Sequence, residues 1–172
     1  MKYADIDNNM KNEIESWGIP DIEELRNRDI KFVFDLNEIN EEETRYNMLF
    51  CKNDNVKFCL YDFTNNIKIF TMDFFKMSER FLKINNELPS LKLELLNVNN
   101  PSLRQKGIAS YYLERLKEYA IKHKYSCIRV TPSPDANVFK DQSKENALNL
   151  KKLTEFYKRK STPEMPIEIL EF

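Results

Sequence analysis

The stretch that decides the fold is Arg104-Gln105-Lys106-Gly107-Ile108-Ala109, a basic segment around one of only two glycines in 172 residues. Residues 91–98 before it are mostly apolar and predict a β-strand. Residues 110–120 after it carry apolar side chains at helical spacing and predict an amphipathic helix. This order is typical of a phosphate-binding turn, because the first N–H groups of a helix lack intrahelical partners and the helix dipole is positive there. The alternative for Gly107 is a turn glycine without a ligand.

Length and charge limit the classes of function. The chain of 172 residues predicts a single domain, 1–172, with an N-terminal helical segment over 1–28. A formal net charge of −1 gives no global attraction to nucleic acid or to an anionic membrane. We therefore expect neither as a partner.

No apolar run approaches the length of a membrane span, and the first residues lack a signal-peptide core. This pattern predicts a cytoplasmic protein. The odd number of cysteines, Cys51, Cys59 and Cys127, favours reduced thiols. His123 is the one histidine, which excludes a metal site built on several histidines. No metal is expected.

The other elements follow from periodicity and turn residues. Helices are predicted over 5–17 and 146–160, a short acidic turn or helix over 21–28, and strands over 30–34, 46–51, 56–63, 67–72, 126–131 and 167–170. The strands between 46 and 72 form an antiparallel meander, whereas 73–88 fit a helix at least as well as a loop. A strand–helix–strand order makes 91–98 and 126–131 parallel neighbours.

The segment 104–109 fits the [Q/R]-x-x-G-x-[G/A] motif of the GNAT superfamily of N-acetyltransferases, which the chain resembles over about 90–160. Phe156-Tyr157-Lys158 is similar to a segment of that family's last helix. The resemblance implies an α/β fold (α+β mixed). Its central mixed sheet has helices on both faces and splays between the family's fourth and fifth strands, here 91–98 and 126–131. Acetyl-CoA, the cosubstrate, would lie in the gap, which makes 91–160 the acetyl-CoA-binding core.

The resemblance also implies which residues bind acetyl-CoA. Backbone N–H groups of 105–109 would hold the pyrophosphate, together with the Ser110 hydroxyl and the Arg104 guanidinium. The end of the strand 91–98 would pair with the pantetheine arm. Lys106 has a solvated side chain as its alternative, and Asn146 is predicted as the cap of the last helix. The implied cofactor-binding residues are Leu96, Val98, Arg104, Gln105, Lys106, Gly107, Ile108, Ala109, Ser110 and Asn149.

Acetyl transfer to an amine needs a base for the ammonium and an acid for the leaving thiolate. The resemblance places Tyr157 near the CoA sulfur as the acid, and its alternative is an amphipathic residue at the edge of the core. Glu94, in the middle of a strand, is the candidate base, and its alternative is a solvent-facing residue. These two residues complete the predicted catalytic set.

Two departures from the family pattern leave the acceptor open. Residues 158–163 replace the usual approach to a terminal hairpin, which predicts a shortened or missing terminal strand pair, and the segment 98–104 is one residue longer than usual. The acceptor is a small-molecule or peptide primary amine, and exposed edge strands make a homodimer plausible. The competing hypotheses are a non-catalytic binding or regulatory module and, through the basic residues of 151–160, nucleic-acid binding.

Overall fold

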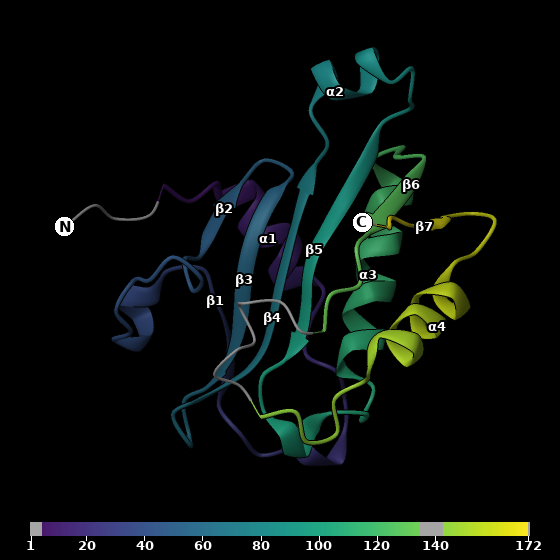
Figure 1. Cartoon of the computed structure of the whole chain (residues 1–172). Helices are drawn as coiled ribbons and strands as arrows, with labels where there is room; N and C mark the ends of the chain where they lie inside the picture. Colours follow the sequence, from purple (N-terminus) through teal and green to yellow (C-terminus); the bar gives the residue numbers. More distant parts are fainter. Residues whose placement is uncertain (1–4, 135–142, 172) are drawn as a thin grey trace.

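The computed structural model describes residues 5–134 and 143–171, and these residues form one seven-stranded mixed sheet flanked by helices (Figure 1). The predicted mixed α/β class is therefore confirmed. The strands are β1 (Ile30–Val33), β2 (Phe50–Lys52), β3 (Asn55–Asp62), β4 (Ile67–Lys76), β5 (Ser90–Val98), β6 (Cys127–Val130) and β7 (Ile167–Ile169). The helices are α1 (Asn8–Ser16), α2 (Glu79–Ile84), α3 (Ile108–Lys122) and α4 (Leu150–Lys160), with 3-10 turns η1 (Glu23–Leu25), η2 (Leu36–Ile39) and η3 (Pro101–Leu103).

The strand order is β1-β3-β4-β5-β6-β7, and β2 pairs with β3 beside β1. The pairs from β1 to β5 are antiparallel, which confirms the predicted meander. β5 and β6 are parallel, as the strand–helix–strand order predicts, and β6 and β7 are parallel as well. Helices α3 and α4 form the two crossovers that parallel neighbours require.

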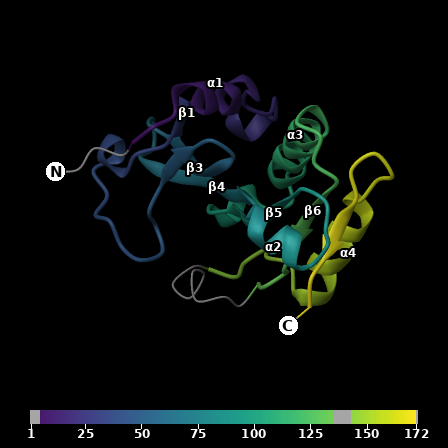
Figure 2. The same cartoon turned by 90° about the horizontal axis from the view of Figure 1, so that it is seen from above.

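The main core lies between the sheet and the two helices α1 and α3, which Figure 2 shows on the same side of the sheet. Its centre is aromatic: the ring of Tyr112 on α3 stacks on Phe70 of β4 with centroids 4.8 Å apart, and Trp17 lies against Phe58 and Phe74. This packing fixes α3 against β4 and β5. Across the described residues, no helix is long and apolar enough to cross a bilayer.

The pairing of β5 with β6 is short. It joins Ser90–Leu93 to Cys127–Val130, and the second half of β5 has its partner in β4 alone among the described strands. A β-bulge marks the point of divergence, because Asp73 faces Leu95 and Phe74 faces Leu93, which leaves Glu94 as the extra residue. The sheet therefore opens between β5 and β6, where the splay was predicted.

Two predicted segments differ from the structure on the N-terminal side. Residues 73–88, whose sequence is ambiguous, contain both the end of a strand and a helix. β4 continues to Lys76 in register with β5, and α2 begins at Glu79. The strand predicted over 46–51 is confined to Phe50–Lys52, and residues 45–47 form a turn. In both segments the conformation depends on pairing with neighbouring strands rather than on the local sequence pattern.

Helix boundaries differ because of capping. The first helix begins at Asn8, three residues later than predicted, since the Asp7 carboxylate accepts hydrogen bonds from the N–H groups of Asn9 and Met10. The segment predicted as an acidic turn over 21–28 holds the single turn η1. At the other end, β7 is the strand that follows α4 within 143–171, and its bounds match the predicted final strand to one residue.

Candidate active site

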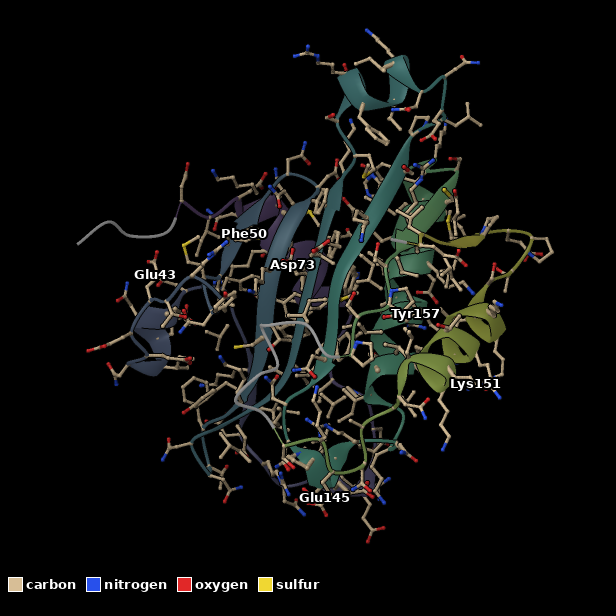
Figure 3. The ribbon with its side chains drawn as sticks, viewed as in Figure 1. Glu43, Phe50, Asp73, Glu145, Lys151 and Tyr157 are labelled. Atoms are coloured by element: carbon tan, nitrogen blue, oxygen red, sulfur yellow. The ribbon has the colours of Figure 1, made fainter. Side chains whose placement is uncertain are left out.

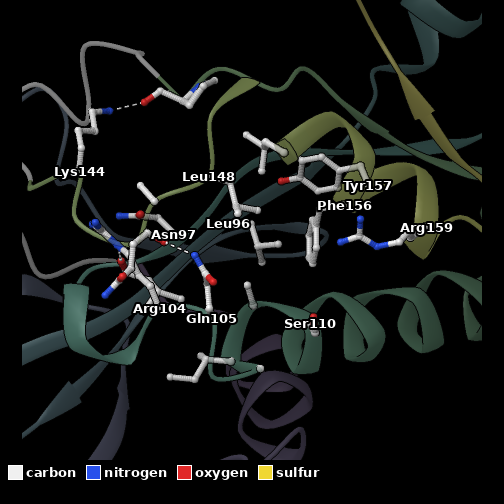
Figure 4. Close-up of a pocket in the computed structure, with 18 of the residues that line it drawn as sticks. Leu96, Asn97, Arg104, Gln105, Ser110, Lys144, Leu148, Phe156, Tyr157 and Arg159 are labelled. Carbon is white, nitrogen blue, oxygen red and sulfur yellow. Dashed lines mark hydrogen bonds between the residues drawn. The ribbon is translucent and has the colours of Figure 1, made fainter. Parts of the chain in front are cut away.

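A cavity of about 470 Å³ opens at the carboxyl end of β5, between the first turn of α3 and helix α4 (Figure 4). It sits where β5 has already left β6, so the splay of the sheet creates it. Of the ten predicted cofactor-binding residues, eight line this cavity: Leu96, Val98, Arg104, Gln105, Gly107, Ile108, Ala109 and Ser110. Lys106 and Asn149 are not among its lining residues.

The first turn of α3 presents unpaired backbone donors to this cavity. Gly107 is the N-cap and offers no side-chain cap, and the first bond of the helix runs from the Tyr111 N–H to the Gly107 carbonyl oxygen. Within the part of the chain that the structure describes, the backbone N–H groups of residues 105–110 donate no hydrogen bond. Such donors, at the positive end of a helix of 15 residues, are suited to an anionic group.

Gly107 adopts a conformation that favours glycine. Its φ is +93°, in the left-handed region, and a Cβ placed on it would meet no atom within 4 Å. The glycine therefore does not make room for protein packing. The space that its missing side chain leaves belongs to the cavity, as a close approach of a ligand to the backbone requires.

Arg104 holds the wall of the cavity together. Its Nε donates to the Val98 carbonyl oxygen at 3.0 Å, and its Nη1 donates to the carbonyl oxygens of Ser143 and Glu145. Burial lowers the pKa of its guanidinium. These contacts join the end of β5 to the segment before α4, so a contact of Arg104 with phosphate remains a prediction alongside this positioning role.

The side chains of Gln105 and Lys106 contact different parts of the protein. Gln105 has a left-handed φ of +61°, and its side-chain amide donates to the Asn146 carbonyl oxygen at 3.0 Å. Lys106 turns away to an ion pair with Glu24 of η1, at 3.7 Å. The side chain of Lys106 therefore belongs to the neighbouring turn, and the contact of its backbone N–H with a pyrophosphate stays a prediction.

The cap of the last helix was predicted at the wrong asparagine. Asn149 is the N-cap of α4, and its side-chain oxygen accepts a hydrogen bond from the Lys152 N–H at 2.9 Å. Asn146 has a left-handed φ of +58° at the end of a turn and lines the cavity instead. Because its side-chain oxygen caps the helix, this placement does not favour a contact of Asn149 with pantetheine. That contact stays a prediction.

Tyr157 lies on the face of α4 that closes the cavity. Its ring is 6% exposed and lies edge-on to that of Phe156, which also lines the cavity. Figure 4 shows the Tyr157 hydroxyl directed into the cavity, toward the side where Leu96 and Leu148 lie. Burial raises the pKa of this phenol, so the hydroxyl keeps its proton over the whole working pH range. A proton donor is therefore available at this wall.

A second cavity, of about 580 Å³, adjoins the first. Leu96, Leu153 and Tyr157 line both, so the two cavities meet at these side chains. Its floor is the face of β3, β4 and β5 opposite the main core, and its rim comes from the ends of β6 and the segment before β2. The two cavities give access to Tyr157 from two directions.

Asp73 lines this second cavity, and its carboxyl group has a raised pKa. It faces Lys57 across the β3–β4 pair and Leu95 across the β4–β5 pair. Burial is the main cause that raises its pKa to about 6; the nearby Glu94 carboxylate adds to the rise, and the charges of Lys57 and Lys92 oppose it. Figure 3 shows Asp73 on β4 and Tyr157 on α4, with β5 between them in that view. Asp73 is a carboxylate whose protonation changes near neutral pH.

Glu94, the predicted base, also lines the second cavity. The bulge turns it to the same side as Leu95, its side chain is 55% exposed, and it pairs with Lys92 at 3.4 Å. It therefore faces solvent and a cation rather than a buried environment. Asp73 is the acidic residue that the sequence reasoning missed, and the signal was the continuation of the strand from Ile67 to Lys76, which places a carboxylate within a strand.

The fold and its two cavities define a mixed α/β protein with unpaired N–H groups at a helix start beside a splayed sheet. No family model matches the chain, and no curated protein matches it. Among solved structures, the chain is similar to a ribosomal-protein-alanine N-acetyltransferase from Brucella melitensis biovar Abortus 2308, with 16% identity and a TM-score of 0.40 over 70% of this chain and 92% of the other. A similarity at this level carries no argument about residues or activity, so the function is argued below from the site.

Proposed function

We propose that this protein is an acetyl-CoA-dependent N-acetyltransferase that transfers an acetyl group to a primary amine. The observation that carries the proposal is the row of unpaired N–H groups at the start of α3, which opens into the gap between β5 and β6. The motif around Gly107 favours the same reading. A second cavity that shares Tyr157 with the first supplies a separate place for the acceptor.

The residues present fit CoA. Backbone donors of 105–110 suit a pyrophosphate, and the empty space at Gly107 allows it to approach. Apolar side chains of Leu96, Val98 and Phe156 suit the pantetheine arm. When bound, acetyl-CoA supplies the thioester whose acetyl group passes to the amine.

The second cavity offers a base for the incoming ammonium. In its ionised form Asp73 is able to accept the ammonium proton, directly or through a water molecule, which frees the nitrogen lone pair for attack on the thioester carbonyl carbon. Glu94, the base predicted from the sequence, lies in the same cavity. We place the role on Asp73, because its burial brings its pKa nearer to neutrality, and Glu94 acts on that pKa through its charge.

The hydroxyl of Tyr157 is suited to the proton transfer to the leaving sulfur. After attack the nitrogen is positively charged and loses its second proton to solvent. As the C–S bond breaks, the sulfur takes a proton from the Tyr157 hydroxyl, and the phenol recovers one from solvent. A phenol is already protonated near neutral pH and burial raises the pKa of Tyr157 further, so its hydroxyl carries a proton when the thiolate forms. The two proton transfers that involve side chains thus occur at Asp73 and Tyr157, residues on different elements that line one cavity.

Titration calorimetry with CoA and with acetyl-CoA tests the proposal. Saturable binding of both at micromolar to millimolar concentration, together with release of free thiol when a primary amine is added, is the expected result. Absence of heat and of a thermal shift at millimolar CoA contradicts it. Binding of CoA without thiol release over a broad amine panel supports instead the non-catalytic module.

Replacing Tyr157 by phenylalanine should lower kcat about 100-fold, the usual scale for a general acid, while the affinity for CoA stays within about threefold. The substitution removes the hydroxyl and keeps the ring that closes the cavity. Steady-state thiol release and calorimetry on the same sample separate the two effects. Equal losses of kcat and of CoA affinity would assign Tyr157 a packing role instead.

Tyr119 provides the matched control for this variant. It is also a buried tyrosine, but it lies in the main core against Trp17, and its hydroxyl donates to Asp54. Tyr119→Phe should lower the melting temperature and leave kcat unchanged. A similar loss of kcat in both variants would show that burial of a hydroxyl, rather than its place in the cavity, determines the effect.

A further inference from the structure

The second cavity combines cations and carboxylates in a way that limits its ligand. Three cations line it, Arg45, Lys57 and Lys92, and two carboxylates, Asp73 and Glu94. A site for a polycation such as a polyamine would present an excess of carboxylates. This cavity has the opposite balance, with one more cation than carboxylates.

Two of the three cations already have partners in the protein. Lys92 pairs with Glu94 at 3.4 Å and donates to the Thr131 hydroxyl at 3.1 Å. Lys57 is 9% exposed, faces Asp73 across the strands and donates to the Tyr46 carbonyl oxygen at 2.8 Å. Both therefore neutralise the carboxylates beside them or hold the wall of the cavity.

Arg45 is placed differently. It lies in the segment before β2, its guanidinium is over the Tyr46 ring at 5.7 Å, and it forms no ion pair with a described carboxylate. A guanidinium is a planar fork that matches a carboxylate or a phosphate. Leu95, Leu96 and Leu153 give the cavity an apolar surface. Arg45 thus offers a charge-assisted contact at the rim of a pocket that has a carboxylate and an apolar floor.

From this arrangement we infer that the acceptor is an amine with an apolar body and an anionic group, a carboxylate or a phosphate, which Arg45 binds while the amine faces Asp73. The inference rests on the proposed acetyl transfer and names the class of its acceptor. It disfavours polyamines and aminoglycosides, which bring several positive charges to a rim that is already cationic.

Matched pairs of amines test the inference. The panel holds α-amino acids, ω-amino acids of increasing length and aminoalkyl phosphates, each beside its neutral carboxamide or alcohol. At least one anionic member should exceed its neutral counterpart about tenfold or more in kcat/KM. An amino acid amide has the lower amine pKa and more free amine at a given pH, so a preference for the acid reflects recognition of its carboxylate. The carboxylate and phosphate arms identify the anion.

The variant Arg45→Gln should bring the ratio within each pair close to one, chiefly by raising the KM of the anionic member. Arg80→Gln, at an exposed arginine of α2, is the matched control and should keep the wild-type ratio. A panel in which no anionic member is favoured, or a preference that survives Arg45→Gln, overturns the inference. Failure of the proposed function is distinct, because it appears as loss of CoA binding and of thiol release with every amine.

Discussion

Replacing Gly107 by glutamate should reduce the affinity for CoA by at least about 100-fold, because a carboxylate would enter the space where a pyrophosphate is expected. The space at Gly107 is open, so the side chain meets no protein atom within 4 Å of its Cβ and the fold is not disturbed by a clash. Calorimetry with CoA measures the loss. Circular dichroism and the melting temperature show whether the variant is folded.

Gly107→Ala separates backbone strain from obstruction. Alanine at a φ of +93° costs about 1 kcal/mol in the left-handed region, but it adds only a methyl group. This variant should melt at a lower temperature and keep most of its CoA affinity. If alanine and glutamate weaken binding equally, backbone conformation controls the site, and direct contact of the backbone with phosphate is not supported.

Replacing Asp73 by asparagine should lower kcat/KM about 100- to 1,000-fold at pH 7.5, the range expected when a general base is lost. In the wild type, kcat/KM should fall as the pH decreases through about 6, because the carboxylate becomes protonated and no longer accepts a proton. The variant should lose this acid limb. A pH–rate profile of both proteins, with acetyl-CoA saturating, is the measurement.

Glu94→Gln distinguishes the two candidate bases. Since the Glu94 carboxylate raises the pKa of Asp73, its removal should move the acid limb to lower pH and change the plateau rate by less than about fivefold. If Glu94 is itself the base, as the sequence predicts, the limb disappears in Glu94→Gln and persists in Asp73→Asn. The two variants therefore assign the role in either case.

The central strand–helix–strand unit was predictable because its signals are local. Apolar residues over 91–98, helical spacing after Gly107 and a second apolar run at 126–131 specify β5, α3 and β6 to within about two residues. The left-handed glycine and the unpaired N–H groups follow from the same segment. The cavity that these elements line was consequently predicted together with most of its residues.

The second cavity was not predictable, because its parts are distant in the sequence. Lys57, Asp73 and Glu94 meet only through strand register, and Arg45 joins them from a segment without regular structure. Likewise, the carbonyl oxygens that Arg104 binds lie about 40 residues away, at Ser143 and Glu145. Spacing along the chain carries no information about such contacts.

The bulge at Glu94 also determines which changes in length this strand tolerates. On a regular strand, consecutive side chains alternate between the two faces, and the extra residue shifts that alternation by one position. Deleting Glu94 would make the strand regular, while Leu93 keeps facing Phe74 and Leu95 keeps facing Asp73, so the side chains from Leu95 to Val98 keep their faces. The strand should therefore tolerate loss of this one residue better than loss of a residue within the regular pairing on either side, where a deletion would exchange the faces of the adjoining side chains.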